Sequence, residues 1–227
     1  MRGAAVRSDD IVLDVGAGRG RLTAPLAERA GHVYAIEVDP VLAGRLRQRF
    51  SGRSNVTVVE GDALRVDLPD LPFRVVANLP FDGSTGILRR LLDDSHLARA
   101  DVILEWEAAR KRASCWPSTM LGIRWGVRYE FVLVRRLPAA CFEPRPLVDA
   151  GLLRIVRREE RLVPDGDHTH FCALVRAAFH HGRPLAALGG PASKRVAREL
   201  GVGPSARPRD LDVHQWAALF TAVRSRR

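Results

Sequence analysis

The sequence predicts an α/β fold, in which a mostly parallel sheet carries helices on both faces and a small helical domain follows. Two observations support this prediction. Short apolar runs, which indicate buried strands, alternate with stretches whose apolar residues recur every three or four positions, which indicate helices. After Pro164 the pattern changes to helices alone. We therefore expect two domains, over residues 1–162 and 163–227.

Five strands are expected in the alternating part of the chain. The apolar runs that predict them cover residues 11–15, 32–38, 56–60, 73–77 and 101–106. Helical spacing occupies the stretches between them. Leu42, Leu46 and Phe50 are four residues apart, and Ser84 or Thr85 can cap a helix after the fourth strand. This alternation indicates parallel strands joined by crossover helices.

Two more strands are expected over residues 130–135 and 152–157. No helical pattern lies between them, so we expect an antiparallel hairpin at one edge of the sheet. Helices of the second domain are predicted over residues 171–179, 193–200 and 216–223, because each range places apolar residues on one helical face.

The chain has 227 residues and a formal net charge of +10. This balance favours a polyanionic partner, and nucleic acid before a membrane surface. Lysine occurs only at Lys111 and Lys194, so nearly all of the positive charge is arginine. A bias of this kind is typical of GC-rich genomes, and we attribute part of the arginine excess to codon usage.

The cysteines Cys115, Cys141 and Cys172 are an odd number without metal-ligand spacing, and we interpret them as reduced thiols. No apolar run has the length of a membrane span, and residues 1–10 lack the apolar stretch of a signal peptide. We therefore expect a cytoplasmic protein that does not enter a membrane.

Histidines cluster in the C-terminal part of the chain, at positions His168, His170, His180 and His181. They lie within or beside a predicted helix, with no carboxylate or cysteine at ligand spacing. We expect these side chains to be solvated and to bind no metal.

A glycine-rich turn follows the first predicted strand, with the pattern Asp14-x-Gly16-x-Gly18-x-Gly20. Glycine lets the backbone turn sharply and approach a ligand at the start of a helix. A dinucleotide loop has the spacing G-x-G-x-x-G, whereas the tighter spacing here suits an uncharged or cationic nucleoside such as S-adenosylmethionine. A purely structural tight turn is the alternative.

Acidic residues stand at the ends of the second and third strands. Glu37 follows the glycine turn by about 20 residues, where a carboxylate can bind both ribose hydroxyls of a nucleoside. Asp39 is the expected cap of the next helix. The Gly61-Asp62-Ala63 turn places a carboxylate where it can accept a hydrogen bond from an adenine amine. The alternative is an aspartate that only shapes the turn at the strand end. Ligands of such sheets bind across the carboxyl ends of the strands.

The segment Asn78-Leu79-Pro80-Phe81 ends the fourth strand. The Asn78 amide oxygen and the Leu79 carbonyl can both accept hydrogen bonds from one exocyclic amine. Pro80 restrains Leu79 to an extended conformation, and Phe81 offers a flat face on which a base can stack. We interpret these four residues as a pocket for a target adenine. The alternative is a polar loop with a buried phenylalanine.

Further candidates lie outside the strand ends. Phe142 begins a turn that is stiffened by Pro144 and Pro146. It could close over the face of the base opposite Phe81. The alternative is a phenylalanine that fills a hydrophobic gap at the edge of the sheet. Arg110 and Lys111 are candidate phosphate contacts on a basic helical stretch. A solvated helix face explains either residue equally well.

The order of these motifs resembles that of the rRNA adenine-N6 methyltransferases, and among them the macrolide-resistance (Erm) type of actinobacteria. The stretches that carry the resemblance are residues 13–20, Glu37, residues 61–63, 78–81, 105–111 and 142–149. The resemblance implies a Rossmann-like class I methyltransferase sheet with a helical RNA-binding domain behind it. It also implies S-adenosylmethionine as cofactor, held by Asp14, Gly16, Gly18, Glu37, Asp62, Ala63 and Asn78.

The implied activity is methylation of one adenine of 23S rRNA, free or in a ribosomal precursor, by a monomeric enzyme. Such methylation gives resistance to macrolide, lincosamide and streptogramin B antibiotics. Asn78, Leu79, Pro80 and Phe81 would hold the target adenine together with Phe142. Dimethylation of small-subunit rRNA and a non-catalytic RNA-binding relic are the alternatives. A nicotinamide dehydrogenase is disfavoured by the loop spacing.

The sequence departs from the family pattern in one respect. Family members typically carry a Gln-Asn-Phe-Leu segment well upstream of the glycine turn, where it folds over the cofactor. No such segment precedes Ile11 here. We expect either a start that lies further upstream or a chain that lacks this segment and binds the cofactor less tightly.

Overall fold

The computed structural model describes residues 5–80, 82–114, 119–184 and 190–224. The chain forms two compact units. The first comprises Met1–Ala109 and Val132–Val156, and the second comprises Arg110–Phe131 and Arg157–Arg227. These ranges differ from the predicted domains chiefly in residues 110–131, which belong to the second unit.

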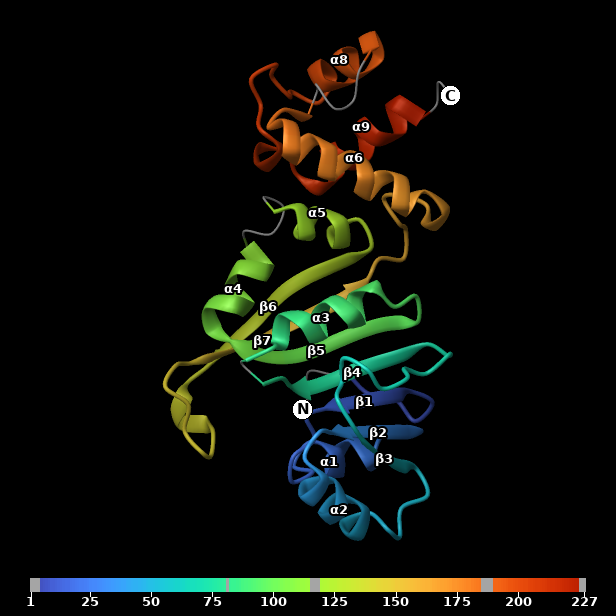
Figure 1. Cartoon of the computed structure of the whole chain (residues 1–227), viewed down its shortest axis with the longest axis vertical. Coiled ribbons are helices and arrows are strands. Elements are labelled where there is room, and N and C mark those ends of the chain that lie inside the picture. Colours follow the sequence, from blue (N-terminus) through green and yellow to red (C-terminus); the bar gives the residue numbers. More distant parts are fainter. Residues whose placement is uncertain (1–4, 81, 115–118, 185–189, 225–227) are drawn as a thin grey trace. The chain divides into compact units, whose positions relative to one another are not determined.

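A seven-stranded sheet is the centre of the first unit (Figure 1), with the strand order β3-β2-β1-β4-β5-β7-β6. The strands are β1 (Ile11–Val15), β2 (His32–Glu37), β3 (Val56–Glu60), β4 (Phe73–Asn78), β5 (Leu97–Glu105), β6 (Tyr129–Leu137) and β7 (Ala150–Arg157). Neighbours among β1 to β5 pair in parallel, while β7 pairs antiparallel with β5. The predicted mostly parallel sheet is confirmed, and β6 and β7 are neighbours at one edge as expected.

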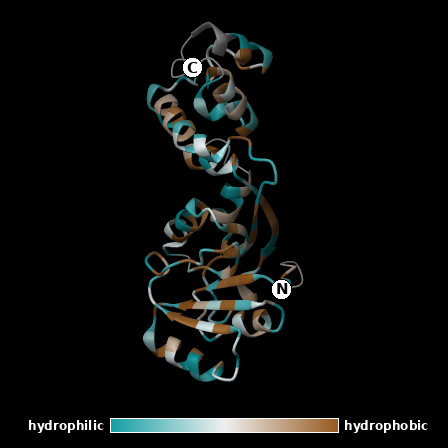
Figure 2. Cartoon of the chain, turned by 90° about the vertical axis from the view of Figure 1, so that its right-hand side faces the viewer, coloured by the Kyte–Doolittle hydropathy of each residue, from teal (hydrophilic) through white to brown (hydrophobic). Residues whose placement is uncertain are grey.

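Apolar side chains explain why these runs form a sheet. The strands appear largely brown in the hydropathy view of Figure 2, and Val12, Leu13 and Val75 are fully buried. The described helices of this unit are α1 (Thr23–Ala27), α2 (Pro40–Arg49), α3 (Ser84–Asp93) and the first part of α4 (Trp106–Ser114), which continues into the second unit from Arg110. A short 3₁₀ turn lies at Ala139–Cys141. Burial on both faces is what parallel strands require.

Helices α1 and α2 pack on the same face of the sheet. Leu26 of α1 lies in a hydrophobic cluster with Val33, and Leu46 of α2 lies in a cluster with Ala35. Val33 and Ala35 are two residues apart on β2, so their side chains share a face. Ile36 points to the opposite face, where it lines a cavity with Ile87 of α3.

The starts of α2 and α3 differ in their capping. Asp39 caps α2 as predicted, because its Oδ1 accepts hydrogen bonds from the backbone N–H groups of Val41 at 2.8 Å and Leu42 at 3.2 Å. Neither Ser84 nor Thr85 caps α3, so that expectation was wrong. The N-cap is Gly83, which has a left-handed φ of 87°. No side-chain hydrogen bond caps this end of the helix.

Glycine at position 151 allows α4 to lie close to β7. A Cβ atom there would come within 2.7 Å of the Ala109 Cβ atom. The loop that joins β6 to β7 is fixed at its end by Asp149, which accepts hydrogen bonds from the Ala139 N–H at 2.9 Å and from Arg136 at 2.7 Å. These bonds lower the pKa of the Asp149 carboxyl.

The second unit is helical. Its helices are α5 (Met120–Gly126), α6 (His168–His181), α8 (Gly190–Glu199) and α9 (Val213–Arg224), with 3₁₀ turns at Asp165–Asp167 and Pro208–Asp210. The sequence pattern predicts α6, α8 and α9 but misses α5. Ile123 of α5 is fully buried in a cluster with Phe171 of α6 and Trp216 of α9. Segment 110–131 therefore completes the core of the helical unit.

One histidine does not follow the sequence-based expectation of solvated side chains. His168 is 9% exposed, and its Nε2 lies 3.0 Å from the carbonyl oxygen of Arg124. The first turn of α6 buries this ring against α5. None of the helices in the described part of the chain is long and apolar enough to cross a membrane.

Candidate active site at the strand ends

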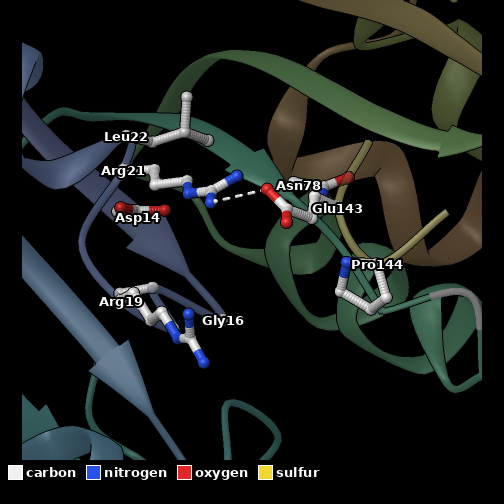
Figure 3. Close-up of a pocket in the computed structure, with 10 residues that line it drawn as sticks. Asp14, Gly16, Arg19, Arg21, Leu22, Asn78, Glu143 and Pro144 are labelled. Carbon is white, nitrogen blue, oxygen red and sulfur yellow. Dashed lines mark hydrogen bonds and ion pairs between the residues drawn. The ribbon is translucent and has the colours of Figure 1, made fainter. Parts of the chain in front are cut away.

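Two cavities lie at the carboxyl ends of the parallel strands. The larger has a volume of about 490 Å³ and contains polar and charged residues (Figure 3). Its lining consists of Asp14, Gly16, Ala17, Gly18, Arg19, Arg21, Leu22, Asn78, Glu143 and Pro144. Strand ends β1 and β4 and the β6–β7 loop therefore meet around one space.

The smaller cavity, of about 230 Å³, is lined mainly by apolar side chains. Its lining consists of Val15, Gly16, Ile36, Val38, Gly61, Asp62, Ala63, Leu64, Pro80, Asp82, Gly83 and Ile87. Gly16 belongs to both linings. The two cavities are thus neighbours on either side of the glycine turn, and an elongated ligand can occupy both.

The glycine turn owes its shape to positive φ angles. Gly16 has a φ of 73°, and a Cβ atom there would lie 3.8 Å from both the Asn78 carbonyl oxygen and the Pro80 Cδ atom. Gly20 has a φ of 75°, and its Cβ would come within 2.9 Å of Leu46 and Phe50. Side chains are therefore excluded by backbone strain at both positions and by packing at Gly20.

Asp14 lines the larger cavity and is 1% exposed. The Thr23 hydroxyl donates a hydrogen bond of 2.7 Å to its Oδ2. Burial raises the pKa of the Asp14 carboxyl to about 7, and the Thr23 bond opposes that shift. A carboxylate with this pKa gains much from a cationic partner, because the charged form is poorly solvated.

Glu37 joins the end of β2 to the glycine turn. Its Oε2 accepts a hydrogen bond from the Gly18 N–H at 2.7 Å, and its Oε1 accepts one from the Asp39 N–H at 3.0 Å. Each carboxylate oxygen can accept more than one hydrogen bond. The predicted role of Glu37 toward ribose hydroxyls therefore stays a prediction, and its observed contact orients the turn.

Asp62 and Ala63 line the smaller cavity, as expected for a base-binding turn. The Asp62 Oδ1 accepts a hydrogen bond from the Leu64 N–H at 2.8 Å, and its side chain is 46% exposed. The Ala63 carbonyl accepts a hydrogen bond from Arg90 at 2.9 Å, which ties the turn to α3. The second Asp62 oxygen, Oδ2, lies 3.9 Å from the Nε atom of the exposed Arg65, and a ligand amine can replace this weak contact.

The segment 78–80 lies where both cavities approach Gly16. Asn78 is exposed and lines the larger cavity, while Pro80 lines the smaller one. Leu79 is 1% exposed, and its N–H donates to the Ile103 carbonyl at 3.1 Å. Phe81 lies outside the described residues. The strand pairing of Leu79 thus holds Asn78 at the cavity.

The β6–β7 loop reaches the larger cavity through Glu143 and Pro144. Glu143 pairs with Arg21 at 3.4 Å, and Figure 3 shows the Arg21 guanidinium pointing toward this carboxylate. Phe142, which we expected over the base, is half-buried one residue before this pair. Its stacking role stays a prediction, although its loop borders the predicted site.

Arg110 and Lys111 are exposed on α4, at the beginning of the second compact unit. Their positions allow contact with an anionic ligand, and their assignment as phosphate contacts stays a prediction. The structure therefore brings together Asp14, Gly16, Gly18 and Asn78 in one lining, and Asp62 and Ala63 in the adjoining one.

Several residues in or beside the larger cavity were not predicted from the sequence. Arg19 and Arg21 alternate with the glycines of the turn, and this adjacency is a signal that could have revealed them. Glu143 lies inside the predicted Phe142 turn but carried no motif of its own. Thr23 could be inferred only from its contact with the buried Asp14.

Comparisons with known proteins agree with this geometry. The family model described as ribosomal RNA adenine dimethylase matches residues 2–223. The mycinamicin-resistance protein MyrB of Micromonospora griseorubida is 40% identical over 219 residues, which are 94% of this chain and 70% of MyrB. Ribosomal RNA small subunit methyltransferase A of Rubrobacter xylanophilus is 34% identical over 97% of this chain and 87% of its own length.

Among solved structures, the crystal structure of the 23S rRNA methyltransferase ErmE is similar with a TM-score of 0.86 and 30% identity. The similarity covers 98% of this chain and 94% of that chain. It confirms the predicted Rossmann-like methyltransferase fold. The chain therefore belongs to the ribosomal RNA adenine dimethylase family, and it is an S-adenosylmethionine-dependent rRNA adenine N6-methyltransferase.

Proposed function

We propose that the protein methylates N6 of one adenine in 23S rRNA and thereby gives resistance to macrolide, lincosamide and streptogramin B antibiotics. The observation that carries this proposal is the position of Asn78 at the larger cavity beside Gly16, where the two cavities meet. MyrB, by its name, is a resistance protein, and ErmE is a 23S rRNA methyltransferase. Both similarities favour the large-subunit target.

The two cavities fit the parts of S-adenosylmethionine. The smaller one offers apolar side chains to an adenine ring and Asp62 to its exocyclic amine. In the larger one, Asp14 can pair with the ammonium group of the methionine part. Gly16 can lie against the ribose between them, because it has no side chain. When bound, the cofactor supplies an electrophilic methyl group attached to a positively charged sulfur.

Asn78 and Leu79 position the attacking amine. The adenine amine is a poor nucleophile, since its lone pair is delocalised into the ring. Hydrogen bonds from this amine to the Asn78 amide oxygen and the Leu79 carbonyl favour a pyramidal nitrogen and direct its lone pair. Positioning and electrostatics provide most of the rate, and we assign no general base. The proton leaves after transfer, when the amine is cationic.

The RNA must present an unstacked adenine to this site. We assign stacking on the flipped base to Phe81 and Phe142, and phosphate contacts to Arg110 and Lys111. The net charge of +10 supports a polyanionic partner. Residues 163–227 are the proposed RNA-binding domain, in a monomeric cytoplasmic enzyme that acts on free or precursor rRNA.

The test is transfer of labelled methyl groups from S-adenosylmethionine to unmodified 23S rRNA, with 16S rRNA as the control. Primer extension on the product locates the modified base. We expect label at one adenine of 23S rRNA. Expression of the gene in a macrolide-sensitive host is expected to raise the inhibitory concentration of macrolides.

Dimethylation of small-subunit rRNA is the second candidate. It is favoured by the similarity to ribosomal RNA small subunit methyltransferase A, of which the chain spans 87%. Label on 16S rRNA alone would establish this activity and overturn the large-subunit assignment. Absence of label on both RNAs, with cofactor binding also absent, would favour a non-catalytic RNA-binding protein.

A further inference from the structure

We propose that Arg21 binds the carboxylate of the methionine part of the methyl donor, and that Glu143 occupies the same guanidinium until the donor enters. This inference rests on the proposed function, because it assigns one more group of the same cofactor. It makes Arg21 a specificity-determining residue for the amino-acid end of the ligand and Glu143 its internal competitor.

The structure already contains a carboxylate at this place. Arg21 and Glu143 are 122 positions apart in the sequence, yet the Arg21 Nη2 atom lies 3.4 Å from the Glu143 Oε2 atom. Both residues line the larger cavity (Figure 3). The guanidinium therefore already faces a carboxylate oxygen, and a ligand carboxylate is chemically equivalent to that of Glu143.

The Arg21–Glu143 pair can be exchanged at little cost. The side chains are 64% and 85% exposed, and ion pairs in such surroundings contribute little to stability. Water and salt screen this contact. An incoming carboxylate that is also anchored by the rest of its ligand can therefore displace Glu143 from Arg21.

The charges of the cavity match a zwitterion better than a phosphate. The lining contains two carboxyl groups, those of Asp14 and Glu143, and the two guanidinium groups of Arg19 and Arg21, so its charges balance. Among them, Asp14 is buried and Arg21 is exposed. An α-amino acid carries an ammonium and a carboxylate, so each of its groups meets an opposite charge. An RNA phosphate at Arg21 carries no cationic group that could pair with Asp14, so the carboxyl groups of the lining would face it without compensation.

The neighbouring cavity supports the same orientation of the ligand. The base-binding features, which are the apolar lining and Asp62, lie in the smaller cavity on the other side of Gly16. With the adenine of the donor placed there, its amino-acid tail extends past Gly16 into the larger cavity. Arg21 lines the larger cavity, and it is not among the described residues that line the smaller one.

The experiment compares two ligands and two proteins. Calorimetry would measure the affinities of S-adenosylmethionine and of decarboxylated S-adenosylmethionine for the full-length protein and for Arg21→Ala. We expect the substitution to weaken S-adenosylmethionine about 10-fold, since hydrogen bonds to charged groups are lost. The affinity for the decarboxylated ligand is expected to remain within about twofold, or to increase, because one positive charge has been removed from its surroundings.

Two further variants sharpen the test. Glu143→Gln is expected to bind S-adenosylmethionine about two- to threefold more tightly, since the competing carboxylate is gone. Arg21→Lys keeps the charge and is expected to recover part of the lost affinity, which shows that the loss does not come from misfolding. Arg45→Ala, an exposed arginine of α2, is the matched control and should bind both ligands like the unsubstituted protein.

Equal effects of Arg21→Ala on both ligands, or no effect on either, would overturn the assignment. Weaker binding of a 23S rRNA fragment with unchanged affinity for S-adenosylmethionine would also overturn it and make Arg21 a phosphate contact. If the unsubstituted protein binds no S-adenosylmethionine, the proposed function fails as well. Tight binding without any dependence on Arg21 removes only the present inference.

Discussion

The two cavities that meet at Gly16 recognise ligands by different physical means. The smaller one presents the side chains of Ile36, Leu64 and Ile87, whereas the larger one presents Asp14 and Arg21. Binding in the first depends on shape and on the burial of apolar surface. Binding in the second depends on charge, so pH and salt are expected to act on that half of the site.

The largest expected effect concerns Asp14 and the pH dependence of stability. The pKa of its carboxyl is 3.8 in the absence of the fold and about 7 in the folded protein. Between about pH 4 and 7 the unfolded chain has lost this proton while the folded chain keeps it. The contribution of Asp14 to the free energy of unfolding should therefore fall by about 1.4 kcal/mol per pH unit in this window, or about 4 kcal/mol in all, and should stay constant at higher pH.

Asp14→Asn is the control for this prediction, because its amide resembles the protonated acid and can still accept the Thr23 bond. Urea unfolding at several pH values would be measured for both proteins. The stability of Asp14→Asn relative to the unsubstituted protein should increase from pH 4 to pH 7. A difference independent of pH would show that Asp14 titrates normally in the folded chain.

Asn78 tests the catalytic part of the larger cavity. Asn78→Ala should lower kcat for methyl transfer by roughly 10²–10³-fold, since an acceptor that orients the transition state is removed. Cofactor affinity should change much less than kcat, because Asn78 is only one of the residues expected to hold the donor, which keeps Asp14 and the smaller cavity. Single-turnover kinetics and calorimetry measure the two quantities. Near-normal turnover would exclude Asn78 from the reaction.

Asp62 tests the smaller cavity. Asp62→Asn keeps an oxygen for the Leu64 N–H but removes the charge that faces a ligand amine. Affinity for S-adenosylmethionine should fall about 5- to 10-fold, and an inosine analogue without the amine should be affected less. Asp39→Asn is the matched control, since asparagine also caps helices and Asp39 lines neither cavity in the described part of the chain. Equal losses for both analogues would argue against base recognition by Asp62.

The smallest effect is expected outside both cavities. Gly44 lies within α2, and a Cβ atom there would meet nothing within 4 Å. Gly44→Ala should stabilise the fold by about 0.5–1 kcal/mol without changing ligand affinity. Gly20→Ala should destabilise the fold, since its Cβ atom would clash with Leu46 and Phe50. Thermal unfolding compares the two, and a destabilised Gly44→Ala would contradict the described packing of α2.

Local patterns predicted the part of the site that depends on strand ends. Buried runs located β1 to β5, and the parallel arrangement then placed Asp14, Asp62 and Asn78 at one edge of the sheet. The glycine spacing indicated a close approach of backbone and ligand, and Gly16 borders both cavities. Such predictions succeed because the fold class determines which ends meet.

Contacts between distant segments were not predictable in the same way. Nothing near Arg21 in the sequence indicates that Glu143 will pair with it, because the pairing follows from the path of the β6–β7 loop. Helix α5 was missed because its seven residues are too few to show a clear periodicity. Its buried Ile123 is explained only by Phe171 and Trp216, which come much later in the chain.

The segment 110–131 has a consequence for how the polypeptide is completed during synthesis. The backbone passes from one compact unit to the other three times, after residues 109, 131 and 156. Ile123 leaves the ribosome long before Trp216, with which it shares a core. Until Trp216 is synthesised, the side chain of Ile123 cannot be buried in its native core. A chain released near residue 162 would therefore leave this apolar side chain exposed. Early termination is therefore expected to yield an aggregation-prone fragment rather than a separately folded catalytic domain.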